Sequence, residues 1–258
     1  MPIHCVYTDL DGTLLGRGAS LFHTAEGDFT LLPTRGIEAC HRAGAEVVLK
    51  SGRRRVQVME DARLLGQRSY IFEMGAGMVI DGELTFLTGE LQPREGASIH
   101  RQIAESGAPE LLLERFSGRL EPHAPWHVDR EVSHVLRGLV EVGEANALLA
   151  SAGHGALRLV DNGEGRPGSR TYHLIPAGVS KARAVEAHMR ARGYAPEECI
   201  GVGDSQEDLG VAAVVGRFFL VANAVGVDES AYANVERTEA PMGEGFYEAV
   251  VRALAESR

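Results

Sequence analysis

Apolar residues in the first third of the chain follow two spacings, one typical of strands and one typical of helices. A short apolar run at residues 4–8, a β-branched run at residues 45–51 and residues 70–73 predict three strands. Between them, apolar positions at helical spacing predict one helix from Pro33 to Gly44 and another that ends at Gly66. Strands that alternate with helices through short connections favour parallel pairing, so this part predicts an α/β fold.

The middle of the chain has a different pattern. Its residues 78–87 alternate around Asp81 and Gly82, the kind of pair that a type I′ hairpin requires. The segments that follow mix both element types: helices are predicted from Pro93 through Ile103 and over 109–116 and 142–150, and strands over 132–136, 156–160 and 171–175. This mixture predicts an α+β insert.

The α/β rhythm returns after Pro176. The expected elements are a helix over 181–192, a strand over 199–203, a helix over 206–215, a strand over 218–222 and a closing helix over 246–254. We therefore expect a split α/β core formed by residues 1–81 and 176–258. Residues 82–175 would form the inserted α+β domain.

The charge balance and the apolar runs exclude several kinds of partner. The 258 residues include 36 acidic and 26 basic side chains, which gives a formal net charge of −10. A protein that binds duplex nucleic acid needs clustered cations to displace counterions, so we expect no nucleic-acid partner. Because no segment approaches the ~20 apolar residues of a membrane helix, and no basic region opens the chain, we expect neither membrane insertion nor a signal peptide.

The three cysteines are far apart in the sequence. They stand at positions 5, 40 and 199, and none belongs to a CxxC pair. This spacing predicts neither a disulfide framework nor a structural zinc site, and it favours the reducing cytoplasm.

Two carboxylates follow the first predicted strand. Asp9 and Asp11 come directly after the apolar run, and Gly12 and Thr13 follow them. Ligands of open α/β sheets bind at the carboxyl ends of the strands, where these side chains would lie. Such a pair can hold a hard cation such as Mg²⁺ while one carboxylate faces a substrate. An EF-hand loop does not fit, because its sixth position would be Leu14 rather than glycine.

A second acidic pair follows another predicted strand. Asp204 stands at the end of the strand over 199–203, and Asp208 lies one helical turn beyond it, on the same face. Taken alone, the segment is equally consistent with a helix N-cap and an acidic residue that favours the helix dipole. Convergence of the two distant pairs on one metal ion would explain both.

Two further segments carry groups that suit phosphate. Ser51, Gly52 and Arg53 end a predicted strand, and a hydroxyl, a backbone amide and a cation can all contact phosphate oxygens. A capping serine is the alternative interpretation. Lys181 begins a predicted helix, where a cation opposes the helix dipole at a small cost, which indicates another role for it.

The order and spacing of these four segments resemble the haloacid dehalogenase superfamily of phosphatases, whose motifs are DxDGT, a serine or threonine, a lysine and GDxxxD. The chain carries them at Asp9–Thr13, Ser51, Lys181 and Gly203–Asp208. The resemblance implies a Rossmann-like core, with a parallel sheet and helices on both faces. The insert lies where members with a type II cap carry their α+β cap domain.

One stretch of the insert resembles a particular group of type IIB, Cof-like members. Residues 169–174 are similar to the Arg-aromatic-His run of mannosyl-3-phosphoglycerate phosphatases, and residues 129–131 are similar to their cap motif. On this basis Arg130, Arg170 and His173 would contact the substrate. A structural or solvated role is the alternative for each of them.

The resemblance also implies an activity, a Mg²⁺-dependent phosphomonoesterase that acts on a small sugar phosphate or related anion. Asp9 would attack phosphorus and form an aspartyl-phosphate, and Asp11 would protonate the leaving oxygen and then activate water. The implied Mg²⁺ ligands are Asp9, the Asp11 carbonyl and Asp204, with Asp208 in the outer shell. The implied phosphate contacts are Ser51, Lys181 and the amides near Gly12 and Thr13, with Gly52 and Arg53 beside them.

Two positions depart from the pattern of many type II members. Glu207 and Met74 both stand where asparagine is common. These two residues leave a non-catalytic sugar-phosphate-binding regulator as an alternative. A phosphomutase of the same superfamily, which would share every core residue, and a phosphoglycolate phosphatase, the nearest rival by substrate, are further alternatives. The expected partner is a small phosphorylated metabolite, bound by a monomer or a homodimer.

Overall fold

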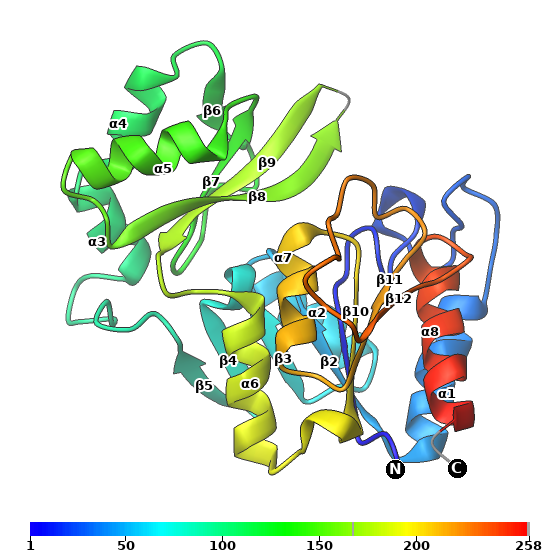
Figure 1. Ribbon diagram of the computed structural model, residues 1–258. Coiled ribbons are helices and arrows are strands. Elements are labelled where there is room, and N and C mark those ends of the chain that lie inside the picture. The colour runs from blue at the N-terminus through cyan, green and yellow to red at the C-terminus, as the bar shows by residue number, and fades with distance from the viewer. Residues whose placement is uncertain (167, 257–258) are drawn as a thin grey trace.

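The core of the protein is a mixed sheet of eight strands (Figure 1). The computed structural model describes residues 1–166 and 168–256. Across the sheet the strands are β12 (Val235–Arg237), β11 (Arg217–Leu220), β10 (Cys199–Gly203), β1 (Cys5–Thr8), β2 (Glu46–Lys50), β3 (Ser69–Phe72), β4 (Gly77–Ile80) and β5 (Glu83–Phe86). The pairings from β12 to β3 are parallel, and β4 and β5 are antiparallel additions.

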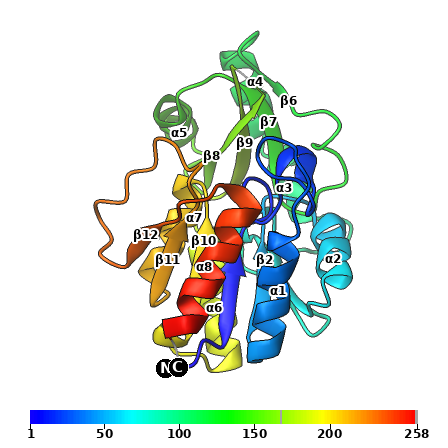
Figure 2. The same ribbon diagram turned by 90° about the vertical axis from the view of Figure 1, so that its right-hand side faces the viewer.

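Helices cover both faces of this sheet (Figure 2). One face packs against α1 (Leu32–Ala43), α2 (Arg55–Leu64) and α8 (Met242–Glu256), and the other against α6 (Lys181–Arg192) and α7 (Gln206–Leu209). Side chains alternate between the two layers, so that Val6 and Val47 face α1 while Tyr7 and Val48 face α6. Because both faces are covered, β1 is buried along its whole length.

The order of the strands reverses beside β1. From this strand the chain proceeds to β2 and β3 on one side, whereas β10, β11 and β12 lie on the other. The carboxyl ends of β1 and β10 therefore flank a topological switch point, where open α/β sheets bind ligands. Asp9 follows β1 and Asp204 follows β10, so the fold places the two predicted acidic pairs at the same crevice.

The part of the chain from Ile99 to Pro176, called the cap below, lies over this edge of the core (Figure 1). It contains an antiparallel sheet and three helices: strands β6 (Leu120–Pro122), β7 (His134–Gly138), β9 (Ser169–Pro176) and β8 (Leu157–Arg166), in this order, with α3 (Ile99–Glu105), α4 (Ala108–Arg115) and α5 (Val142–Ser151). Its apolar core forms around Phe116 and Tyr172 and continues to Met74 of the main core.

The predicted hairpin belongs to the core sheet. Asp81 and Gly82 have positive φ values of 50° and 92°, as a type I′ turn requires. The second strand, β5, pairs with β4, so residues 83–86 belong to the core sheet. The expected boundary had placed them in the insert, which was to begin at residue 82. Phe86 packs edge-on against Phe72 with ring centroids 6.3 Å apart, which holds this strand in the core.

Other predicted boundaries also moved. The helix expected from Pro93 begins at Ile99, because Gly96 turns the chain with φ of 73° and Ser98 caps the helix by accepting a hydrogen bond from the Arg101 amide. The helix expected over 206–215 ends at Leu209 and continues as a 3-10 turn. The strand expected over 132–136 lies two residues later, and the three-residue strands β6 and β12 were missed.

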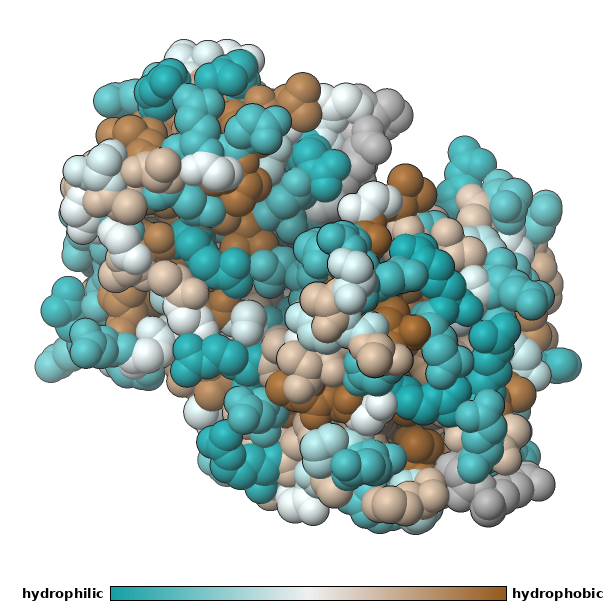
Figure 3. All heavy atoms as spheres, in the orientation of Figure 1, coloured by the Kyte–Doolittle hydropathy of each residue, from teal (hydrophilic) through white to brown (hydrophobic). Residues whose placement is uncertain are grey.

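Hydrophilic side chains cover most of the face shown in Figure 3, and hydrophobic ones form scattered patches on it. The apolar residues of the described chain gather instead in the two layers beside the core sheet and in the cap. None of the helices in residues 1–166 and 168–256 combines the length and the hydropathy that crossing a bilayer requires.

The packing of α8 on α1 gives a first testable prediction. Phe246 is fully buried, and Gly36 lies so close to its ring that an added Cβ would be 2.8 Å from it. We expect Phe246→Ala to lower the free energy of unfolding in urea by about 3–5 kcal/mol. Val251→Ala, at a position of the same helix that is 40% exposed, should cost less than about 1 kcal/mol. Equal losses in the two variants would contradict this packing.

Candidate active site

A buried lysine joins two carboxylates at the crevice. Lys181, the first residue of α6, donates hydrogen bonds to Asp9 Oδ1 at 2.8 Å and to Asp208 Oδ1 at 2.9 Å. All three side chains are at least nine-tenths buried. Burying an ion is costly unless it is paired and hydrogen-bonded, so these three groups depend on one another.

Three carboxylates form a group that suits a divalent cation. Oxygens of Asp9, Asp204 and Asp208 all lie within 4.8 Å of one another. Burial and the neighbouring carboxylates raise the pKa of Asp204 to about 7. Burial likewise raises the pKa of Asp9 to about 6, although Lys181 opposes the shift. Because Mg²⁺ takes carboxylate oxygens as ligands and would offset this crowding of like charge, the residues present fit that ion.

A second buried lysine, which sequence reasoning missed, completes the group. Lys50 ends β2, is fully buried, and donates a hydrogen bond from its Nζ to Asp208 Oδ1. Burial opposes ionisation of Asp208, yet Lys181 and Lys50 together hold its pKa well below the usual range. The available signal was a charged residue inside an apolar strand, which needs a buried partner when both faces of the sheet are covered.

The turn after β1 requires glycine. Gly12 has φ of +77°, and a Cβ there would lie 2.3 Å from Asp204 Oδ2. Its carbonyl accepts a hydrogen bond from Asn223 Nδ2 at 2.9 Å, and Thr13 Oγ1 donates to Asp204 Oδ1 at 3.3 Å. These contacts hold the turn against the end of β10.

The second acidic segment is fixed by a similar close approach. A Cβ on Gly203 would lie 2.3 Å from Cβ of Asp208, so glycine lets the start of α7 approach the strand end. Ser205 caps α7 by accepting a hydrogen bond from the Asp208 amide at 3.2 Å, and its hydroxyl donates to Asp208 Oδ2 at 2.5 Å. Asp208 therefore both belongs to the first turn of α7 and faces the lysines.

Asp11 lies apart from the buried carboxylates. Its side chain is 55% exposed, and Arg53 binds it through two hydrogen bonds of 2.8 and 2.6 Å. A third hydrogen bond, of 2.8 Å, joins Arg53 to Asp61. The residue expected to protonate the leaving group and one expected to bind substrate are thus paired with each other.

Cap side chains lie against the loop that follows Ser51. That serine is buried, and a Cβ on the next residue, Gly52, would lie 3.0 Å from both His173 Nε2 and Asn162 Nδ2. Arg130 Nη1 donates a hydrogen bond to the Gly52 carbonyl at 3.0 Å. The structure therefore brings Arg130 and His173 to the loop at Gly52, together with Asn162, which sequence reasoning missed.

The imidazole of His173 is held neutral. Burial, followed by the charges of Arg130 and Lys181, lowers its pKa well below the usual range. Nδ1 shares a hydrogen bond of 3.3 Å with Ser133 Oγ. Arg170, the other substrate contact expected from the same run, pairs with Asp161 inside the cap.

Glu73 fastens the cap to the core. Its buried carboxylate accepts hydrogen bonds from the backbone amides of Glu131, Val132 and Ser133 at 2.9, 3.2 and 2.6 Å. Three amide donors stabilise a buried carboxylate much as a cation would.

Both departures from the family pattern contact the cap, because Met74 packs in its apolar cluster and Glu207 pairs with one of its strands. Met74 has φ of 63°, a conformation that asparagine adopts more readily, and its Sδ would lie 3.1 Å from a Cβ on Gly52. Glu207 forms an ion pair of 3.1 Å with Arg158 of β8. Each residue therefore has a structural contact that asparagine would not reproduce.

Comparison with known proteins places this geometry in a family. The chain is 30% identical over 224 residues to the phosphoglycolate phosphatase of Halorubrum lacusprofundi, covering 86% of each chain. The chain belongs to the haloacid dehalogenase superfamily. It is a phosphomonoester hydrolase. The phosphoglycolate phosphatase of Archaeoglobus fulgidus is 27% identical over 250 residues, 95% of this chain and 94% of that one. No family model matches the sequence.

Solved structures confirm the expected fold class. The sucrose-phosphatase of Synechocystis, solved with sucrose and phosphate, superposes with a TM-score of 0.69 at 16% identity and covers 98% of each chain. A haloacid dehalogenase-like hydrolase from Bacteroides thetaiotaomicron gives 0.66 at 15% identity, over 97% of this chain and 99% of that one. The Rossmann-like core with an inserted α+β cap is thus shared with these members of the superfamily.

The turn at Gly12 gives a second prediction. We expect Gly12→Ala to lower kcat/KM for p-nitrophenyl phosphate by about 100-fold or more, because the new methyl group displaces Asp204 from the carboxylate group. Gly18→Ala is the matched control, since Gly18 also has a positive φ, of 70°, but a Cβ there would meet nothing within 4 Å. Comparable loss of activity in both variants would attribute the effect to backbone strain instead of Asp204.

Proposed function

We propose that this phosphatase hydrolyses a small phosphorylated carboxylic acid, phosphoglycolate, through an aspartyl-phosphate intermediate. The observation that carries the proposal is the closure of cap side chains on Gly52, beside an arginine that can bind a carboxylate. The two curated relatives described above, both phosphoglycolate phosphatases, support the same substrate.

The charges of the site favour a divalent cation together with an anionic substrate. Two buried carboxylates, Asp9 and Asp208, pair with two buried lysines, Lys50 and Lys181, and the half-buried Asp204 lies beside them. When bound by Asp9, Asp204 and Asp208, Mg²⁺ supplies the positive charge that offsets repulsion between a carboxylate nucleophile and a phosphate dianion. The carboxylate group supports the proposal of Mg²⁺, and it includes Asp208, for which the resemblance implied an outer-shell place.

Asp9 is the proposed nucleophile. Lys181 fixes its Oδ1, and the amide of Asp9 donates to the Val202 carbonyl at 3.1 Å, so the carboxylate is held at the strand end. Attack would form a bond from a carboxylate oxygen to phosphorus while the bond from phosphorus to the leaving oxygen breaks. Water would then attack phosphorus, release inorganic phosphate and regenerate Asp9.

Asp11 is the proposed acid and base, and Arg53 controls its availability. In the structure both oxygens of Asp11 are bound to Arg53. A substrate carboxylate offers Arg53 an alternative bidentate partner, which would free Asp11 to protonate the leaving oxygen and then to activate water. This exchange would couple recognition of the carboxylate to catalysis.

The cap favours a short leaving group. Met74, Asn162 and His173 all lie against Gly52, which restricts the space beside the phosphate loop. Residues 169–174, the run that resembles mannosyl-3-phosphoglycerate phosphatases, make contacts within the cap. The Tyr172 hydroxyl, for example, donates a hydrogen bond to the Val140 carbonyl at 3.0 Å. These contacts support phosphoglycolate over the larger sugar phosphates.

The nucleophile can be tested by substitution. We expect Asp9→Asn to release no more inorganic phosphate from phosphoglycolate than the uncatalysed reaction, because an amide cannot form the intermediate. The folded state should persist, since Lys181 keeps its ion pair with Asp208, and circular dichroism would check this. Turnover equal to wild type would exclude Asp9 as the nucleophile. Retention of phosphate on the wild-type product would instead identify a mutase.

The role of Arg53 predicts a split between substrates. Arg53→Met should raise KM for phosphoglycolate about tenfold or more relative to KM for p-nitrophenyl phosphate, which has no carboxylate. Arg42→Met, at an exposed arginine of α1, should leave the ratio unchanged. An equal change for both substrates would show that Arg53 acts only through Asp11. A panel that includes mannosyl-3-phosphoglycerate and sugar phosphates would test the substrate class itself.

A further inference from the structure

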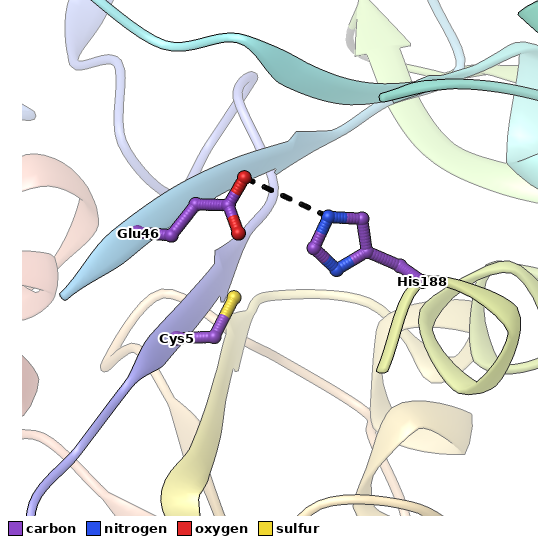
Figure 4. A group of neighbouring side chains, drawn as sticks. All are labelled: Cys5, Glu46 and His188. Atoms are coloured by element: carbon purple, nitrogen blue, oxygen red, sulfur yellow. Dashed lines mark ion pairs between the residues drawn. The ribbon is translucent and has the colours of Figure 1, made fainter. Parts of the chain in front are cut away.

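A second group of ligand-type side chains lies at the amino ends of β1 and β2, away from the catalytic carboxylates. One ligand atom from each of Cys5, Glu46 and His188 lies within 4.8 Å of the other two. Figure 4 shows the three side chains pointing toward one another from β1, β2 and α6. Cys5 and His188 are fully buried, and the side chain of Glu46 is 16% exposed.

We propose that Cys5, Glu46 and His188 bind Zn²⁺. A thiolate, an imidazole and a carboxylate are the three ligand types that zinc takes in proteins. The catalytic group, in contrast, offers oxygen only, which suits Mg²⁺. The two sites therefore differ in the metal that they select.

An unpartnered nitrogen points into the proposed site. His188 Nε2 is buried, and no hydrogen-bond partner for it exists among the described residues. Glu46 Oε1 lies 3.7 Å away (the dashed line in Figure 4), which is an ion pair only when the imidazole is protonated and is beyond hydrogen-bond distance. A buried polar atom without a partner is costly, and a metal ion at this point would satisfy it.

The spacing is close to that of a tetrahedral site. Zinc bonds of about 2.0–2.3 Å place neighbouring ligand atoms about 3.3–3.6 Å apart. The 3.7 Å between His188 Nε2 and Glu46 Oε1 is already near this range. Since the limit for the remaining pairs is 4.8 Å, they need to close by no more than about 1.5 Å, which small side-chain rotations supply.

Neighbouring side chains supply the supporting hydrogen bonds that metal ligands commonly have. Tyr7 Oη shares a hydrogen bond of 2.8 Å with His188 Nδ1, and a hydroxyl can accept from that nitrogen when Nε2 binds a metal. Ser69 Oγ and Tyr194 Oη donate to Glu46 at 2.5 and 3.1 Å. The ligands are thus oriented before any ion binds.

The charge of Arg192 and the proton on the Cys5 thiol both bear on the affinity of the site for a metal ion. Arg192 donates to Glu46 Oε1 at 3.0 Å, and its charge opposes a cation. Burial, with Cys199 and Glu46 nearby, raises the pKa of the Cys5 thiol, so the free site holds a thiol. Binding of Zn²⁺ would displace the thiol proton to solvent and leave a metal-bound thiolate.

The experiment measures zinc on the full chain. Protein stripped with a chelator would be incubated with Zn²⁺ in excess Mg²⁺, which keeps the catalytic carboxylates occupied, then freed of unbound metal and analysed by mass spectrometry. We expect about one zinc per chain for wild type and for Cys40→Ser, which removes a buried cysteine of α1 outside the group. Cys5→Ser and His188→Gln should retain none.

Substitution of Co²⁺ for zinc distinguishes metal bound by Cys5 from metal bound elsewhere on the protein. Co²⁺ in place of zinc should give the near-ultraviolet absorption of a thiolate-to-metal transition in wild type and Cys40→Ser, and lose it in Cys5→Ser. Turnover of p-nitrophenyl phosphate with Mg²⁺ would show that each variant is folded. Zinc binding that persists in Cys5→Ser, or wild-type protein that binds none, would overturn the proposal.

Discussion

The ion pairs of Lys181 with Asp9 and Asp208 are the constraint on which the rest of the site depends. Carboxylates this close together could not be buried side by side without a cation among them. Lys181 supplies that charge from the first turn of α6, and Lys50 supplies a second from the end of β2. The start of this helix and the ends of two strands are therefore positioned by electrostatics as much as by packing.

The cap depends on a different use of buried charge. Glu73 lies 3.9 Å from the buried guanidinium of Arg130, and three consecutive amides of the cap donate to its carboxylate. An ion pair between Arg158 of the cap and Glu207 of the core also joins the two parts. Backbone donors fix orientation more narrowly than a flexible lysine does, so the cap meets the phosphate loop in a defined position.

Sequence patterns predicted the site residues that belong to short continuous motifs. Asp9 and Asp204 could be found because each follows an apolar strand and belongs to a short motif. Lys50 belongs to no motif, and only its charge inside an apolar strand indicated a buried partner. Asn162 gave no such signal, because the residues that it meets lie far away in the chain. The cysteine spacing gave no indication of a zinc site for the same reason: Cys5 meets His188 only after the sheet and α6 have assembled. Short edge strands such as β6 were missed because three residues show no periodicity.

The length of α6 has a consequence for how the chain can evolve. Lys181 and His188 are two helical turns apart, so both face the sheet, one at the catalytic end and the other about 10 Å away toward the opposite end. A single residue inserted between them would rotate one of the two side chains by about 100° and withdraw it from the sheet. Insertions and deletions in this stretch should therefore be as restricted as changes in the motifs themselves.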